Sequence, residues 1–167
     1  THPGVSMIPP DIPSDQPVGV FDSGLGGISI LRELRQLLPG EDYLYFADSA
    51  WCPYGIRPPE EIRARSAAVV ADLVVAGAKT VVIACNTASA MAVFSLRDDF
   101  PDVPLIGLEP AVKPAVEQTK VGRVGVLATP RTVAGERLRW LIETYGAGVA
   151  VHRVAATGLV ELVEAGI

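Results

Sequence analysis

Hydrophobic residues along this chain gather in short runs, and longer stretches of helical character separate these runs. The short runs are apolar on both faces rather than alternating with polar residues, which is typical of buried parallel strands. Six such runs predict strands at 18–21, 43–47, 79–85, 103–108, 123–129 and 148–154.

The stretches between these runs predict helices. Glycine or proline stands near almost every end of these stretches, as expected where helices stop. The predicted helices cover 28–38, 60–76, 87–99, 110–119, 131–145 and 157–165. Strands and helices that alternate with short connections predict an α/β fold with an open, doubly wound, mostly parallel sheet.

Composition limits the size and the partners of this fold. The chain has 167 residues, of which 49% are hydrophobic, enough to fill one core. Its net charge of −5 argues against nucleic acid and anionic membrane as partners. No apolar run reaches the roughly 20 residues that span a bilayer, so we expect a cytoplasmic protein. Residues 1–16 contain four prolines and predict a flexible leader without chemistry.

Ligands of doubly wound sheets bind at the carboxyl ends of the strands, and the first predicted strand ends in DSGLGG at 22–27. This is no dinucleotide fingerprint, because Ser29 stands where the third glycine is needed, and no lysine followed by Ser or Thr makes it a phosphate loop. What remains is a tight turn whose N–H groups favour a carboxylate or another anion. Asp22 could equally be a capping residue.

Histidine and lysine are placed unfavourably for catalysis. His2 lies in the leader and His152 in a predicted strand, which argues against a histidine-based triad or metal cluster. Lys79, Lys113 and Lys120 do not follow the carboxyl end of any predicted strand, where a Schiff-base lysine would be most useful. We therefore expect neither a metal nor a pyridoxal cofactor.

The two cysteines, Cys52 and Cys85, form no disulfide framework and suit a reducing compartment. Cys52 lies in the loop WCPYG, at 51–55, which is either a surface turn or a rigid loop over a pocket; there it is an exposed thiol without a neighbouring base. Cys85 ends a buried strand directly before a helix, where the helix dipole and N–H groups stabilise a thiolate. Cys85 is either core filler or a chemical group, and these surroundings favour chemistry.

Four segments, in this order and at this spacing, resemble the glutamate racemases of the aspartate/glutamate racemase superfamily. They are FDSGLGG, WCPYG, ACNTAS and LATPRT, and the resemblance runs from Pro17 to the end of the chain. It implies inversion of L-glutamate to D-glutamate for peptidoglycan synthesis, with no cofactor and no metal. It also implies two similar α/β halves and two cysteines that transfer protons. Two are needed because the proton leaves one face of the α-carbon and returns to the other.

The resemblance also implies roles for individual residues. Cys85 corresponds to the first thiol, Asp22 to an acid that assists it, and Ser23 to a residue that holds the substrate. Glu164, in LVELVEAG, corresponds to an acid that partners the second thiol. The remaining substrate-binding positions are Pro53, Tyr54, Gly55, Asn86, Thr87, Thr129 and Thr132.

The family's second cysteine lies in a Cys-Thr-His motif, which residues 1–167 do not contain, and Cys52 cannot replace it. We therefore expect the native protein to be longer than this chain. Residues 17–108 then form the first half, and residues 109–167 begin a second half that is incomplete here.

Two other functions are left open: racemisation of aspartate or another small acid, and non-catalytic binding of a small anion. The expected partner is the small-molecule substrate, with no nucleic acid and no membrane, and a homodimer is left open.

Overall fold

The computed structural model describes residues 15–167, so the predicted leader lies almost wholly outside the described residues. Four parallel strands form the first sheet, in the order β2-β1-β3-β4. The central strand β1 pairs with a neighbour on each side, so that Val20 lies beside both Tyr45 and Val82. These strands are β1 (Val18–Asp22), β2 (Tyr43–Ala47), β3 (Thr80–Ile83) and β4 (Leu105–Gly107).

Helices cover both faces of this sheet. Successive residues of a strand point to opposite faces, so a strand that is apolar along its length has side chains to bury on each face. Val18 and Val20 pack against α1 (Gly27–Leu37) on one face. Phe21, the residue after Val20, packs on the other face against α2 (Pro59–Val75) and α3 (Asn86–Asp99). Strands that are apolar on both faces therefore produce two cores, one on each side of the sheet.

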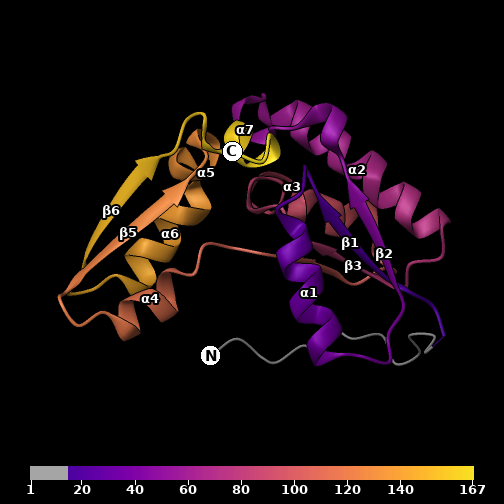
Figure 1. The fold of residues 1–167 in the computed structure, drawn as a ribbon, viewed down its shortest axis with the longest axis horizontal. Helices are drawn as coiled ribbons and strands as arrows, with labels where there is room; N and C mark the ends of the chain where they lie inside the picture. Colours follow the sequence, from indigo (N-terminus) through magenta and orange to yellow (C-terminus); the bar gives the residue numbers. More distant parts are fainter. Residues whose placement is uncertain (1–14) are drawn as a thin grey trace.

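Two further parallel strands, β5 and β6, form a second sheet, shown at the left of Figure 1. Helices α4 and α6 cover one of its faces and enclose a core of Val112, Val126, Leu138 and Leu141. Helix α7 lies between the two sheets in Figure 1. The elements of this part are α4 (Val112–Gln118), β5 (Arg123–Ala128), α5 (Pro130–Ala134), α6 (Glu136–Tyr145), β6 (Ala150–Ala155) and α7 (Leu159–Glu164).

The prediction of an α/β fold with parallel strands is confirmed. One helix differs from its prediction: the stretch 131–145 forms two helices, because Gly135 is extended, with φ −69° and ψ 145°. The boundary between the halves at residues 108 and 109 stays a prediction.

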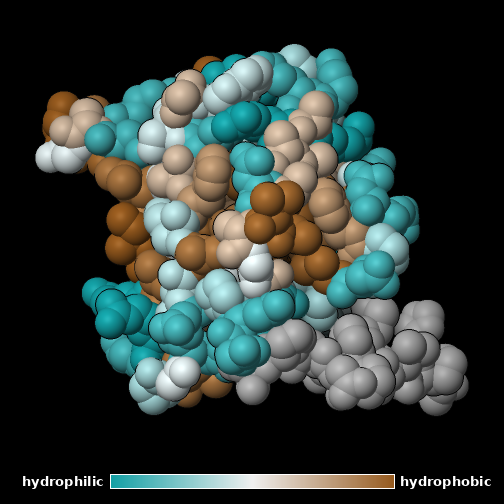
Figure 2. All heavy atoms as spheres, turned by 90° about the vertical axis from the view of Figure 1, so that its right-hand side faces the viewer, coloured by the Kyte–Doolittle hydropathy of each residue, from teal (hydrophilic) through white to brown (hydrophobic). Residues whose placement is uncertain are grey.

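Within residues 15–167, no helix has the length and apolar character that crossing a bilayer requires. Figure 2 shows the side of the molecule on which the edge strand β2 lies. Apolar residues gather in the middle of this face, with hydrophilic residues above and below them.

Candidate functional site

One cavity of about 620 Å³ is lined by residues from both sheets, at the carboxyl ends of β1, β3 and β5. Every residue that the sequence predicted for the site lines this cavity. These residues are Asp22, Ser23, Pro53, Tyr54, Gly55, Cys85, Asn86, Thr87, Thr129, Thr132 and Glu164.

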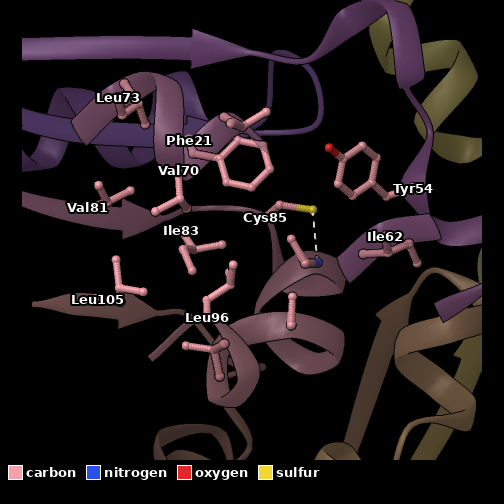
Figure 3. Packing of buried hydrophobic residues seen from close by; sticks show 14 of the residues in the cluster. Phe21, Tyr54, Ile62, Val70, Leu73, Val81, Ile83, Cys85, Leu96 and Leu105 are labelled. Carbon is pink, nitrogen blue, oxygen red and sulfur yellow. Dashed lines mark hydrogen bonds between the residues drawn. The ribbon is translucent and has the colours of Figure 1, made fainter. Parts of the chain in front are cut away.

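Cys85 lies at the junction of β3 and α3, where it acts as the N-cap of the helix. Its Sγ accepts a hydrogen bond from the Ala88 N–H at 3.4 Å, drawn as a dashed line in Figure 3. The thiol donates to Ser23 Oγ, also at 3.4 Å. Only 7% of Cys85 is exposed, yet the residue lines the cavity, so the sulfur lies between the core and the cavity.

The protonation of Cys85 differs from the sequence-based expectation. Burial raises the pKa of its thiol, and the nearby Asp22 carboxylate raises it further. The contacts with Ser23 and with the Ala88 N–H lower the pKa, but they do not outweigh burial. The expectation of a stabilised thiolate was wrong because it counted the helix N-terminus and left out the loss of water around the sulfur.

Two N–H groups of the turn at 22–27 donate hydrogen bonds to carboxylates of the protein itself, those of Asp22 and Glu164. Asp22 Oδ2 accepts a hydrogen bond from the Gly24 N–H at 3.0 Å, so its side chain closes the turn. Gly26 is the N-cap of α1 and makes no side-chain cap bond. The Leu25 N–H donates to Glu164 Oε1 at 2.8 Å, which brings α7 against the turn. A Cβ at Gly24 would lie 2.2 Å from Glu164 Oε1, so glycine is what permits this approach.

Three threonine hydroxyls form a cluster that connects the two sheets. Thr87 Oγ1, in the first turn of α3, lies 3.0 Å from Thr129 Oγ1 and 3.3 Å from Thr132 Oγ1. Thr129 Oγ1 also donates to Thr132 Oγ1 at 3.1 Å and accepts from the Thr132 N–H at 3.3 Å. Hydroxyl groups both donate and accept, so this cluster can rearrange to bind a carboxylate or an ammonium group.

The WCPYG loop is not a surface turn. It forms two short 3₁₀ helices, η1 (Ser49–Trp51) and η2 (Tyr54–Ile56), and Tyr54 is only 1% exposed. The Tyr54 and Phe21 rings lie near the Cys85 sulfur, as Figure 3 shows. A Cβ at Gly55 would lie 2.4 Å from Thr129 Cβ, so the loop packs directly on the end of β5.

Cys52 in the same loop is half-buried rather than exposed, which corrects the prediction of an exposed thiol. Burial raises the pKa of Cys52 to about 11, with smaller contributions from Glu164 and Asp22. The sequence suggested no neighbouring base or positive charge that would lower the pKa of Cys52, and its raised pKa agrees with this expectation.

Comparison with known proteins relates this geometry to a family. The sequence profile of the Asp/Glu/Hydantoin racemases matches residues 19–167. The chain belongs to this family.

Relatives of this chain are similar along most of its length. A glutamate racemase of Roseiflexus sp. (strain RS-1) is 55% identical over 153 residues, which are 92% of this chain and 56% of the relative. The crystal structure of Escherichia coli glutamate racemase with L-glutamate and the activator UDP-MurNAc-Ala superimposes with a TM-score of 0.85 at 37% identity. The superposition covers 90% of this chain and 57% of the Escherichia coli protein.

The Francisella tularensis enzyme in complex with D-glutamate has a TM-score of 0.77 and is 32% identical, over 92% of this chain and 57% of that protein. This chain therefore spans somewhat more than half the length of the relatives it matches.

The lining of the cavity is mostly apolar, and no positive side chain among the described residues contributes to it. Within residues 15–167, its ionisable residues are Asp22, Glu164, Tyr54 and Cys85, and no lysine, arginine or histidine lines it. In the same part of the chain, no group of three or more His, Cys, Asp or Glu residues is arranged to hold a metal ion. A bound anion would thus depend on N–H groups and hydroxyls rather than on an ion pair.

Sequence reasoning missed two parts of this site. The first is the apolar lining, which no motif marks; it includes Leu108, Val112, Val126, Leu159, Val160 and Val163. The second is Asp48, a buried carboxylate behind the cavity wall. Asp48 comes directly after the second predicted strand, so the rule that pointed to Asp22 and Cys85 also pointed to it.

Proposed function

We propose that this chain provides one proton-transfer group and much of the substrate pocket of a cofactor-independent glutamate racemase. The position of Cys85 carries the proposal. Its thiol lines the cavity at the carboxyl ends of the strands, in contact with Ser23 and beside the first turn of α3. The named glutamate racemases that match most of this chain support glutamate as the substrate.

The pocket fits a small amino acid with carboxylate groups. The N–H groups of the first turn of α3 and the hydroxyls of Thr87, Thr129 and Thr132 bind a carboxylate without a counterion. Asp22 and Glu164 supply negative charge for the ammonium group. Asn86, Ser23 and the 53–55 segment complete the polar and steric boundary of the pocket.

Cys85 acts on one face of the substrate α-carbon. Its thiol is protonated in the free protein, so it can give a proton to a carbanion on that face; after losing the proton, the thiolate can remove one. Asp22 assists by making the Cys85 thiolate a stronger base, because its negative charge raises the pKa of the thiol. The opposite face needs a second acid/base, and the proposal assigns this role to a Cys-Thr-His segment of the full-length protein, with Glu164 as its partner.

The biological role follows from the reaction. D-glutamate is a building block of bacterial peptidoglycan, so the proposed reaction supplies cell-wall synthesis in the cytoplasm. A homodimer stays an open prediction.

A substrate comparison tests this proposal. Purified full-length protein is incubated with L-glutamate, D-glutamate or L-aspartate, and the enantiomers are separated by chiral chromatography. We expect inversion of both glutamate enantiomers and little inversion of aspartate. Preference for aspartate would identify the sister activity, and no inversion of either amino acid would favour an anion-binding module.

Substitution of each cysteine identifies the thiol that acts. Cys85→Ala should lower the glutamate rate at least about 100-fold, since a general acid or base supplies roughly 10²- to 10⁴-fold. Cys52→Ala is the matched control and should stay within about 3-fold of the parent, because removing a group outside the proton path costs little. A lethal Cys52→Ala with an active Cys85→Ala would overturn the assignment.

A further inference from the structure

One buried carboxylate near the cavity is not explained by the proposed chemistry. Asp48 is 2% exposed and does not line the cavity. Its Oδ2 accepts from the Tyr54 hydroxyl at 2.6 Å and from Arg65 Nε at 2.7 Å, and its Oδ1 accepts from the second Arg65 nitrogen at 2.7 Å. We propose that Asp48 is a positioning residue for the racemase site, which fixes the 53–55 wall of the substrate cavity through the Tyr54 hydroxyl.

Asp48 is itself held rigidly. Its backbone N–H donates to the Asp22 carbonyl at 2.9 Å, and its own carbonyl accepts from the Trp51 N–H at 2.9 Å. The guanidinium of Arg65, which reaches over from α2, lies 5.6 Å from the centre of the Trp51 ring. Asp48 thus ties the end of β1, the loop and α2 together at one point, next to the catalytic candidate Asp22.

The hydrogen bond to Asp48 determines where Tyr54 lies. Burial raises the pKa of Tyr54, and the Asp48 carboxylate raises it further, so the hydroxyl stays protonated and donates. The ring packs edge-on against Phe21, with the centroids 6.1 Å apart, and lies near the Cys85 sulfur in Figure 3. Because its hydroxyl is engaged by Asp48, Tyr54 contributes a wall beside the thiol rather than a proton.

A displacement of Tyr54 would also shift the threonines that are proposed to bind substrate. The next residue, Gly55, packs so closely on Thr129 that a Cβ would lie 2.4 Å from Thr129 Cβ. Thr129 in turn contacts Thr87 at 3.0 Å, at the start of the helix that Cys85 caps. The path from Asp48 through Tyr54 and Gly55 therefore ends at the groups proposed to bind substrate.

A carboxylate is needed at this position because its two oxygens receive three donors. An amide offers one oxygen and turns an NH₂ group toward the remaining donors, so at least one of these contacts is lost. Asp48→Asn is therefore a nearly isosteric test of the proposal. Glu61→Gln is the matched control: Glu61 pairs with Arg57, which also stacks on Trp51, but neither residue of this pair contacts the Tyr54 hydroxyl.

The experiment measures kcat and KM for both glutamate enantiomers in the full-length protein, and it rests on the proposed function. Asp48→Asn should lower kcat/KM about 5- to 100-fold, mainly by raising KM, as expected when buried partners lose a hydrogen bond. Tyr54→Phe should lower it about 3- to 10-fold. When Asp48→Asn is added to Tyr54→Phe, kcat/KM should fall by less than a further factor of about 3, because the contact between the two residues is already lost. Glu61→Gln should stay within about 2-fold of the parent, the small effect of a half-exposed pair.

The double-mutant cycle separates positioning from general destabilisation. The proposal would be overturned if the double variant lost kcat/KM by the product of the two single losses. It would also be overturned if a folded Asp48→Asn protein had a kcat/KM within about 2-fold of the parent. If Asp48→Asn does not fold, Tyr54→Phe decides alone: an unchanged KM contradicts the proposal, and a raised KM with intact kcat supports it. A parent protein that does not invert glutamate would instead refute the proposed function.

Discussion

The Thr87 hydroxyl lies 3.0 Å from the Thr129 hydroxyl, and this contact joins the first turn of α3 to the end of β5. Thr87 follows Cys85 by two residues, so the sheet that carries the thiol is tied to the second sheet within the cavity lining. A substrate carboxylate that binds here would contact both sheets at once. The threonine cluster joins the two walls of the cavity, and under the proposed function it would also contribute to the affinity for substrate.

Removal of one hydroxyl from this cluster should weaken substrate binding. Thr129→Val keeps the shape of the side chain and should raise KM about 2- to 12-fold with little change in kcat, since one hydrogen bond is worth about 0.5–1.5 kcal/mol. Thr129→Ser keeps the hydroxyl and should stay near the parent. Steady-state kinetics on L-glutamate measures both, and equal KM values for the two variants would contradict the role of the hydroxyl.

A methyl group at Gly55 should separate the loop from β5. The added Cβ would lie 2.4 Å from Thr129 Cβ, well inside contact distance, so Thr129 or the loop must move. We expect Gly55→Ala to raise KM at least about 10-fold and to lower the thermal midpoint, as overpacking of a filled site usually costs about 1–3 kcal/mol. Gly40→Ala is the control, because a Cβ there meets nothing within 4 Å. If both variants behave like the parent, the close packing of the loop on Thr129 is wrong.

The stability of the fold should depend on pH through Asp48. Burial opposes ionisation of this carboxyl, but hydrogen bonds from Arg65 and Tyr54 outweigh it and lower the pKa of Asp48. A group with a lowered folded pKa stabilises the fold above its unfolded pKa of about 3.9 and loses that contribution as the pH falls. Denaturant unfolding between about pH 7 and pH 2 should therefore show a shallower pH dependence for Asp48→Asn than for the parent.

The exposed Asp102 provides the control for this measurement. Asp102→Asn should leave the pH profile of the free energy of unfolding close to that of the parent. Parallel profiles for Asp48→Asn and the parent would mean that the Asp48 carboxylate gains nothing from Arg65 and Tyr54.

The protonation of Cys85 should respond to Asp22. Burial raises the pKa of the thiol and the Asp22 charge raises it further, so the thiolate should form only above the ordinary cysteine value of roughly 8.5. Asp22→Asn removes that negative charge and should lower the pKa. Thiolate absorbance, titrated in a Cys52→Ala background, reads Cys85 alone. An unchanged or raised pKa in Asp22→Asn would show that the two groups do not interact as the structure places them.

The fold was predictable because most of its strands are apolar on both faces and most of its helices end near glycine or proline. Cys85 and Asp22 were accessible to sequence reasoning for a related reason, since each stands at the carboxyl end of a strand. Gly135 interrupts a predicted helix, because its extended backbone ends α5 and begins α6.

The parts that sequence reasoning missed depend on contacts between distant residues. Asp48 becomes a buried anchor only when Arg65, from α2, and Tyr54, from the loop, converge on it. The raised pKa of Cys85 has the same origin, because burial by Tyr54, Phe21 and α3 follows from the three-dimensional packing and not from the local sequence.

Solvent deuterium most directly tests the central claim that Cys85 transfers a proton at the substrate α-carbon. Full-length protein is incubated with L-glutamate in D₂O, and the deuterium content of the D-glutamate formed is followed by NMR and chiral separation. A thiol proton exchanges with solvent, so the parent should form D-glutamate that carries deuterium at the α-carbon. In Cys85→Ala this formation should fall at least about 100-fold, with far-ultraviolet circular dichroism unchanged, while Cys52→Ala stays near the parent. A folded Cys85→Ala protein that forms deuterated D-glutamate within a few-fold of the parent rate would contradict the account.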